Sequence, residues 1–221
     1  MIRLSHVSRV YQSAAGEVHA LRDLNLEISP CTFAAVTGPS GCGKSTLLNL
    51  LGGLDQPTSG EVRVGDLRLD GADDTVLTAY RRSQLGMVFQ FFNLLPSMTA
   101  VENVELPLLL RGDKAGAARV RAMELLDLAG LTARARAFPH QMSGGEMQRA
   151  AVARALVHGP SLLLADEPTG NLDSDNAERV LSLFQKIASQ GLATLIIVTH
   201  SSEAAAVATR QIPMIDGRLA G

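Results

Sequence analysis

The chain of 221 residues is short of several residue types, and each shortage excludes a class of protein. Its two cysteines, Cys31 and Cys42, are too few for a disulfide framework or a cysteine metal cluster, and they favour a reducing cytosol. Its formal net charge is only −2, so no nucleic-acid partner is expected from the charge of the whole chain. With 46% hydrophobic and 19% charged residues, the composition is that of a soluble globular protein.

Long apolar segments are also missing. No run approaches the roughly 18 apolar residues of a membrane span. Residues 1–12 lack the uninterrupted apolar core of a signal peptide. We therefore expect any membrane role to be exerted through a partner.

The hydrophobic pattern that is present predicts two kinds of strand. Over residues 1–30 apolar positions alternate, which predicts short, half-buried antiparallel strands. Residues 61–71 alternate on both sides of Gly65 and Asp66, as in a hairpin. Three continuous apolar runs are typical of parallel strands covered on both faces, and each leads into a helical pattern. These runs and helices are 33–38 with 43–52, 162–166 with 174–190, and 193–200 with 201–209.

The segment of residues 95–155 has a different pattern. It lacks strand signals, and residues 116–130 are amphipathic at helical spacing up to Gly130. We therefore predict an α/β fold with a mostly parallel sheet, an N-terminal antiparallel β-subdomain and an inserted α-helical subdomain at about residues 95–155.

The motif G-x-x-x-x-G-K-S, which begins at Gly38, lies between a predicted buried strand and a helix, the context of a phosphate loop. Its glycines permit a backbone curl whose N–H groups converge on phosphate oxygens, with the helix dipole behind them. Lys44 can reach the β and γ phosphates, and the Ser45 hydroxyl suits Mg²⁺. Cys42 is interpreted as a small filler residue rather than a redox sensor. The predicted nucleotide-binding residues here are Gly38, Pro39, Ser40, Gly41, Cys42, Gly43, Lys44, Ser45 and Thr46.

Two adjacent carboxylates, Asp166 and Glu167, end the predicted strand over residues 162–166. Asp166 at the strand's carboxyl edge can hold the metal, directly or through water. Glu167 can face the γ-phosphate and polarise a water molecule for in-line attack. Together with the phosphate loop, the pair makes this a P-loop NTPase core that binds and hydrolyses a nucleoside triphosphate.

The sequence S-G-G-E at residues 143–146 predicts a helix start, with Ser143 and Glu146 as a capping box. The capping box does not explain Gly144 and Gly145, since each glycine costs roughly 1 kcal/mol against alanine inside a helix. Glycines at a helix start indicate that something approaches the backbone closely.

Six short motifs occur in order along the chain. They are GPSGCGKST (38–46), FQ (89–90), MSGGEMQR (142–149), LLLADE (162–167), NLD (171–173) and TH (199–200). In this combination the chain resembles the ATPase subunits of ATP-binding cassette (ABC) transporters over essentially its whole length. The resemblance implies the ABC ATPase fold for a single ATP-binding domain of residues 1–221, with ATP and Mg²⁺ as cofactors.

The resemblance also implies a head-to-tail homodimer in which the MSGGEMQR segment, the signature, covers the phosphate loop of the other subunit. The Ser143 hydroxyl and the Gly145 N–H would then contact the γ-phosphate held by the opposite Lys44, and Gly144 would let the two backbones close around ATP. Ser143 can serve as cap in the free subunit and as ligand in the closed dimer.

Further roles follow from the resemblance one residue at a time. Gln90 matches the glutamine that senses the metal and the attacking water, and His200 matches the histidine that contacts the γ-phosphate. Asp173 matches the loop that connects the two active sites. Tyr11 falls where an aromatic ring stacks on adenine, with a hairpin-core tyrosine as the rival interpretation. The implied catalytic residues are Glu167, His200, Gln90 and Lys44, and the implied metal ligands are Ser45, Gln90 and Asp166.

The motifs resemble most the branch that serves lipoprotein release and macrolide export. This implies a motor bound to a transmembrane permease on the cytoplasmic face of the inner (plasma) membrane. A coupling helix of the permease would dock near Gln90–Met98, where about half of the apolar residues are expected to fill the core instead. A cell-division type ATPase that regulates a membrane partner without moving cargo, and a soluble mechanical ABC ATPase, stay open as alternatives. The apolar candidates are Phe91, Phe92, Leu94, Leu95 and Met98.

Overall fold

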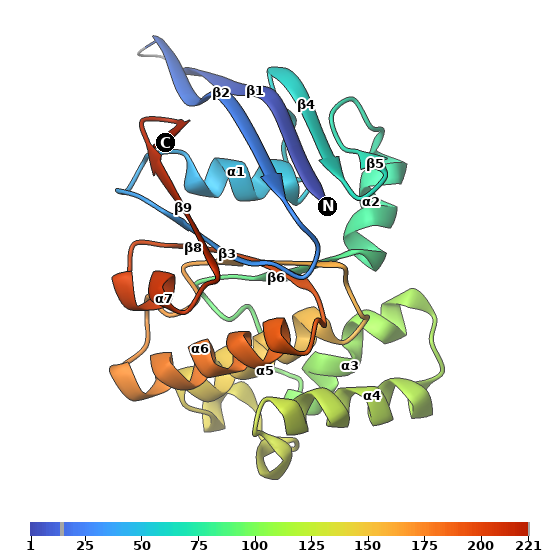
Figure 1. Cartoon of the computed structure of the whole chain (residues 1–221). Coiled ribbons are helices and arrows are strands. Elements are labelled where there is room, and N and C mark those ends of the chain that lie inside the picture. Colours follow the sequence, from blue (N-terminus) through green and yellow to red (C-terminus); the bar gives the residue numbers. More distant parts are fainter. Residues whose placement is uncertain (14–15, 221) are drawn as a thin grey trace.

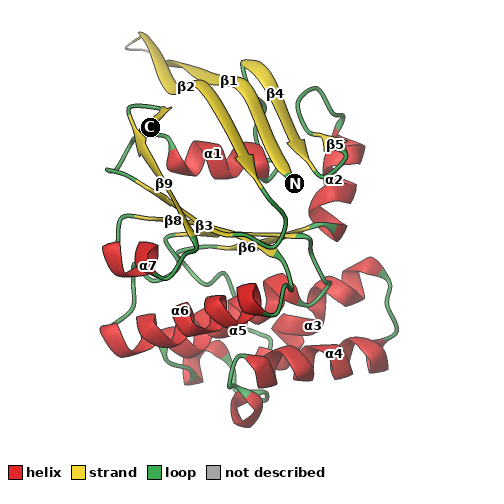
Figure 2. Cartoon of the chain, in the orientation of Figure 1, coloured by secondary structure: helices red, strands yellow, loops and turns green. Residues whose placement is uncertain are grey.

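A computed structural model of the chain describes residues 1–13 and 16–220, so Ala14, Ala15 and Gly221 of the expected single domain lie outside the described residues. The elements stack in layers (Figure 1). An antiparallel sheet covers helix α1 (Lys44–Leu51), a second sheet lies beneath α1, and the remaining long helices pack under that sheet. Figure 2 shows the same alternation of sheets and helices by colour.

The antiparallel sheet has the strand order β2-β1-β4-β5 among the described residues. Its strands are β1 (Ile2–Ser13), β2 (Gly16–Ile28), β4 (Ser59–Val64) and β5 (Leu67–Arg68). The predicted hairpin is confirmed, because Val64 pairs with Leu67 around a two-residue turn. The expectation of short strands over residues 1–30 was wrong: β1 has 12 residues and β2 has 13. Register shifts between Leu4 and Val10 interrupt the alternation, so the sequence shows one long pair as short pieces.

The second sheet has the order β10-β9-β3-β8-β7-β6, again counting described residues only. Five strands are parallel and only β10 pairs antiparallel, which confirms the mostly parallel core. Every residue of β8 is buried, as expected for a strand covered on both faces. The strands are β3 (Phe33–Thr37), β6 (Leu85–Val88), β7 (Leu162–Asp166), β8 (Thr194–Thr199), β9 (Arg210–Ile215) and β10 (Arg218–Leu219).

Alternate residues of the parallel strands face two separate hydrophobic cores. Ala34, Leu164 and Ile196 pack with α1 and the antiparallel sheet. Their neighbours Phe33 and Leu163 pack with the helices on the other face. Because both faces are covered, the carboxyl ends of the strands are the accessible edge of the sheet, where ligands bind in open α/β folds.

The helices are α2 (Asp74–Ser83), α3 (Ala100–Arg111), α4 (Ala115–Leu128), α5 (Gly144–Leu156), α6 (Ser174–Ser189) and α7 (Ser202–Ala206), with 3-10 turns at Thr132–Arg134 and Pro139–Gln141. Residues 95–155 are all described and contain no strand. The helix expected over 201–209 was wrong at its end. It stops at Ala206 because Thr209 already donates its N–H to the Phe33 carbonyl as the chain turns into β9.

In the described part of the chain, none of the helices combines the length and the apolar character that a membrane crossing requires.

Candidate functional site

The phosphate loop joins β3 to α1, and its glycines are needed for two different reasons. Gly38, Gly41 and Gly43 have φ of 152°, 80° and 103°, a region that side chains disfavour. A Cβ atom at Gly38 would also lie 2.2 Å from the carbonyl oxygen of Met214. One at Gly43 would lie 2.3 Å from that of Ala20. The loop is therefore fixed by close backbone contacts on both sides, and Gly41 is needed for its conformation alone.

Lys44 begins α1 and is only 7% exposed. Its Nζ donates to the carbonyl oxygens of Gly38 and Pro39, at 2.8 and 2.9 Å, so the ammonium lies across the loop. Cys42 is buried and packs into the core below, with its Sγ 3.9 Å from Nζ. Because a redox-sensing thiol must be accessible, this burial favours the filler interpretation of Cys42.

A hydroxyl and a carboxylate come together beside the loop. The Ser45 Oγ lies 3.5 Å from Oδ1 of Asp166 at the end of β7. Burial raises the pKa of the Asp166 carboxyl, and the adjacent Glu167 carboxylate acts in the same direction. Two oxygen donors on the phosphate side fit a magnesium ion, which prefers a few protein oxygens together with phosphate oxygens. A cation there would relieve the crowding of negative charge at the strand end.

Glu167 and His200 form the closest polar contact at the edge of the parallel sheet. Oε1 of Glu167 lies 2.9 Å from Nδ1 of His200, and the Glu167 side chain is 18% exposed. Glu167 has φ of 45°, and its N–H donates to the Val198 carbonyl of β8. The left-handed turn places the carboxylate between β7 and β8 instead of letting the strand continue. The carboxylate is therefore fixed in position at the expected γ-phosphate side.

Gln90 follows β6, the next strand of the sheet. Its Nε2 lies 3.4 Å from Oδ1 of Asn171 and 3.4 Å from the position that a Cβ at Gly170 would take. A Cβ at Gly170 would also lie 3.7 Å from Cβ of Glu167. The structure thus brings Gln90, Glu167 and His200 together from the ends of three adjacent strands, β6, β7 and β8.

The signature begins α5, and its capping box is confirmed. The Ser143 Oγ accepts the N–H of Glu146 at 3.2 Å, and the Glu146 carboxylate accepts the N–H of Ser143 at 2.9 Å. Ser143 itself is exposed. The structure gives the glycines an additional, local reason. A Cβ at Gly145 would lie 2.1 Å from Oδ1 of Asn176 on α6, whereas at Gly144 the nearest atom would be 3.4 Å away.

Asp173 caps α6. Its carboxylate accepts the N–H of Asn176 at 2.9 Å and the Nδ2 of the same residue at 2.8 Å. These hydrogen bonds lower the pKa of the Asp173 carboxyl. Asn176, held in this way, is the residue against which Gly145 packs, so the start of α5 and the start of α6 are joined by one polar cluster.

Tyr11 on β1 is half-buried and held by two neighbours. Its hydroxyl donates to Oδ2 of Asp55 at 2.6 Å, and the Arg9 guanidinium lies 4.4 Å from the ring centroid. Arg9 also pairs with Asp55 through two N–H groups, at 2.7 and 2.9 Å. The ring is therefore oriented, with one face covered by Arg9, so a stacking partner would need the other face.

Three residues that sequence reasoning missed hold the loop after Gln90. On α5, Gln148 donates to the Phe89 carbonyl at 3.3 Å, and Arg154 donates to that of Phe92 at 3.1 Å. On α3, the fully buried Asn103 donates to the carbonyls of Leu95, Met98 and Thr99 and accepts the N–H of Leu95. The only signal in the sequence was the presence of polar residues in otherwise apolar helices.

Comparisons with known proteins agree with this geometry. The family model described as ABC transporter matches residues 21–170. An ABC transporter ATP-binding protein of Methanocaldococcus jannaschii, MJ0796, is 44% identical over 223 residues, with 99% of this chain and 95% of that protein covered. The lipoprotein-releasing system ATP-binding protein LolD of Bordetella pertussis is 43% identical over 218 residues, with 99% and 94% covered.

Solved structures are similar as well. A dimeric structure of MJ0796 in a post-hydrolysis state, bound to ADP and Pi, has a TM-score of 0.91 and 41% identity. The match covers 100% of this chain and 97% of that chain. A second dimeric structure of the same cassette also has a TM-score of 0.91, with 42% identity. From the phosphate loop, the ends of β6 to β8 and these matches together, we conclude that this chain belongs to the ABC transporter family and is one of its ATP-hydrolysing cassettes.

Proposed function

We propose that the chain is the motor subunit of a membrane transporter and binds two ATP molecules between two head-to-tail copies of itself. The observation that carries the proposal is the meeting of Gln90, Glu167 and His200 beside the phosphate loop. Support for a dimer comes from the MJ0796 cassette, which was solved in dimeric form. We also propose that residues 1–221 form one ATP-binding domain, with a helical subdomain at about 95–155.

Each group would have a separate task around the triphosphate. Lys44 and the amides of the loop hold the β and γ phosphates. Ser45, Asp166 and Gln90 would hold a magnesium ion, which supplies positive charge to the phosphate oxygens when bound. Tyr11, oriented by Arg9 and Asp55, would offer the free face of its ring to the adenine.

Hydrolysis requires a base for the attacking water, and Glu167 is the proposed base. With a proton on Nδ1, His200 donates to Oε1 of Glu167 and fixes the carboxylate. The other oxygen, Oε2, is then available to polarise a water. It lies 3.4 Å from the N–H of His200, a contact too long to compete strongly.

In the proposed dimer, Ser143 and the amides of Gly144 and Gly145 would complete the site of the other copy. Ser143 is exposed in this chain, so its hydroxyl can contact a second subunit while its backbone keeps the helix start. Asp173 and Asn176 lie beside Gly145, so this loop would move together with the signature.

Transmission to a membrane subunit is proposed to pass through the loop of residues 90–98. Phe91 is 71% exposed and Leu95 is 42% exposed, whereas Leu94 packs against the core of the helices. Exposed apolar side chains of this kind suit a docked helix. Because Gln148 and Arg154 connect the loop to α5, a displacement of the loop would reach Ser143 at the start of that helix.

The proposed cargo process is lipoprotein release, on the support of the 43% identity to LolD over 218 residues. The chain would then lie on the cytoplasmic face of the inner membrane, peripheral through its permease. The test is to purify the tagged chain from solubilised membranes, identify the co-purifying membrane protein, and reconstitute both in proteoliposomes. We expect the ATPase rate to rise with the membrane subunit, together with release of a lipid-modified protein.

The outcomes separate the alternatives. ATPase stimulation without release of any lipid-modified protein would favour a regulatory role or another cargo. High ATPase activity that does not depend on a membrane protein would contradict the transporter assignment.

A further inference from the structure

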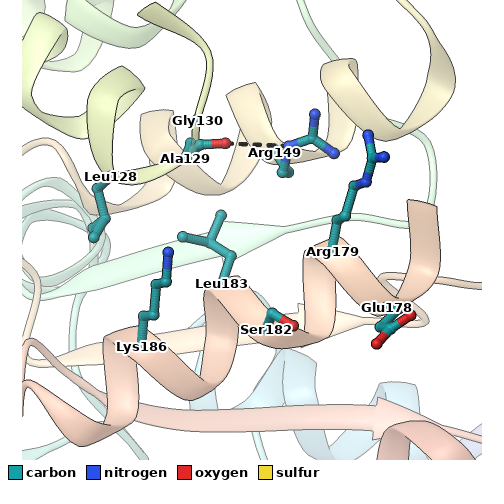
Figure 3. Close-up of a pocket in the computed structure, with 9 residues that line it drawn as sticks. All are labelled: Leu128, Ala129, Gly130, Arg149, Glu178, Arg179, Ser182, Leu183 and Lys186. Carbon is teal, nitrogen blue, oxygen red and sulfur yellow. Dashed lines mark hydrogen bonds between the residues drawn. The ribbon is translucent and has the colours of Figure 1, made fainter. Parts of the chain in front are cut away.

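A cavity of about 370 Å³ lies between α4, α5 and α6 (Figure 3). Its lining comes from the end of α4, from Arg149 on α5 and from one side of α6, and it includes Arg179 and Lys186. None of the residues proposed to bind ATP lines it. Its volume is at the lower end of the range for small-molecule sites.

Arg149 is a buried cation whose hydrogen bonding is incomplete. It is only 8% exposed, and its Nε donates to the Ala129 carbonyl at 3.2 Å. Its Nη1 is buried and has no hydrogen-bond partner among the described residues. A buried charged donor without an acceptor is costly, so this nitrogen calls for a ligand that accepts hydrogen bonds.

A second guanidinium faces the first. Figure 3 shows the Arg179 side chain extending from α6 toward the guanidinium of Arg149, with Lys186 further along the same helix. Burial lowers the pKa of Arg149, and the positive charge of Arg179 lowers it further. In the described part of the chain Arg179 has no salt bridge, although it contributes weakly to the low pKa of Asp173.

The charge of the lining favours an anion with more than one negative charge. Three cations (Arg149, Arg179 and Lys186) and one carboxylate (Glu178) give a net charge of +2. In Figure 3 the Glu178 side chain lies away from the Arg149 guanidinium, so the carboxylate does not separate the two arginines. Arginine forks bind phosphate with two parallel hydrogen bonds, which suits two guanidiniums that face one cavity.

We propose that this cavity binds a phosphate-bearing anion, held by Arg149 and Arg179 with Lys186 at the exposed rim. The phosphate could belong to a soluble molecule or to a lipid headgroup. A bound anion would join α5 to α6, the helices that begin at the signature and at Asp173, so the site is placed to influence the dimer contact without touching the phosphate loop.

The first experiment is a calorimetric titration with inorganic pyrophosphate, in a Lys44→Ala background so that the phosphate loop does not contribute. We expect saturable binding at one site. Arg179→Gln should weaken it about tenfold, the loss of one charge-assisted contact. Arg149→Gln should do the same. Arg136→Gln removes an equally exposed positive charge elsewhere and should leave binding unchanged.

A change of opposite sign keeps the test sharp if Arg149→Gln fails to fold. Glu178→Gln removes the only carboxylate from the lining and should strengthen pyrophosphate binding several-fold. Glu203→Gln on α7 is the matched control and should have no effect. Binding that ignores both Arg179→Gln and Glu178→Gln would overturn the proposal.

The second experiment distinguishes the sources of the phosphate. The chain is sedimented with vesicles of phosphatidylcholine alone or mixed with phosphatidylglycerol. Binding to the mixed vesicles that Arg179→Gln abolishes, without pyrophosphate binding, would assign a lipid headgroup. Pyrophosphate binding without vesicle binding would assign a soluble ligand. The absence of both would refute the site.

Discussion

Gly145 and Asn176 are in such close contact that no side chain fits between them: an added Cβ at Gly145 would lie 2.1 Å from Oδ1 of Asn176. Asn176 cannot easily move away, because Asp173 accepts hydrogen bonds from both its backbone N–H and its Nδ2. The second signature glycine is thus required inside its own chain, before any second subunit is considered.

The first prediction separates the two glycines. Gly145→Ala should lower the free energy of unfolding by about 1–3 kcal/mol, because the methyl group overpacks the contact with Asn176. Gly144→Ala should be neutral or slightly stabilising, since its nearest neighbour would be 3.4 Å away and alanine favours helices. Urea unfolding of both variants measures the difference. Equal stabilities would contradict the described packing of α5 against α6.

The second prediction concerns Lys44. Lys44→Ala should reduce ATP affinity by on the order of 10²-fold, because the β and γ phosphates lose charge-assisted hydrogen bonds. A titration with a fluorescent ATP analogue measures this. Lys114→Ala is the control, since it removes the same charge from an exposed position at the start of α4. Unchanged affinity in Lys44→Ala would show that ATP binds elsewhere.

The third prediction tests whether Ser143 acts on the other subunit. Ser143→Arg should leave ATP binding by the single subunit nearly intact but prevent hydrolysis, because the added side chain blocks closure. Since Ser143 also caps α5, Ser143→Ala is the control for the lost cap, which is worth about 1 kcal/mol.

Mixing makes this test specific. A dimer of one Ser143→Arg and one Lys44→Ala subunit would contain one complete composite site. Partial recovery of ATPase activity is therefore expected on mixing. If the mixture is as inactive as its components, Ser143 does not contribute in trans.

The sequence allowed the phosphate loop, the parallel strands and the Gly65–Asp66 hairpin to be predicted, because each depends on residues that are neighbours along the chain. The capping box of Ser143 and Glu146 was predictable for the same reason. The length of β1 was not, since its register shifts depend on pairing with β2.

Contacts between distant segments were also beyond prediction. Asn176 lies 31 positions after Gly145, and nothing local indicates that α6 approaches α5 there. Asp55, which orients Tyr11, reaches it from 44 positions further along the chain. Such pairs are decided by how the layers pack, and a single sequence carries little trace of them.

The fourth prediction concerns the loop proposed to contact the permease. Phe91→Glu should weaken the membrane subunit's affinity roughly tenfold or more, since a charge replaces an exposed aromatic contact. The readout is the concentration of membrane subunit that gives half-maximal ATPase stimulation. Val120→Glu on α4 is the matched control, because Val120 is 62% exposed and outside the loop. If both variants respond alike, residues 90–98 are not the docking site.

The last prediction tests the proposed base and the dimer with one substitution, Glu167→Gln. The glutamine carbonyl oxygen can still accept from Nδ1 of His200, so the 2.9 Å contact should be preserved. The amide is no longer a useful proton acceptor, and hydrolysis should fall by roughly 10²-fold or more. ATP binding should survive, because Lys44, Ser45 and Asp166 are unchanged and one negative charge beside the triphosphate is removed.

Blocked hydrolysis should then trap the assembly. With ATP held between the phosphate loop of one copy and the signature of the other, the Glu167→Gln protein should elute as a dimer from a size-exclusion column in ATP and Mg²⁺. Adding Ser143→Arg to the same chain should restore the monomer, which distinguishes a signature-mediated dimer from non-specific association. If Glu167 only caps the turn after β7, the amide should hydrolyse ATP at nearly the parent rate and stay monomeric, and both the base and the dimer would have to be reassigned.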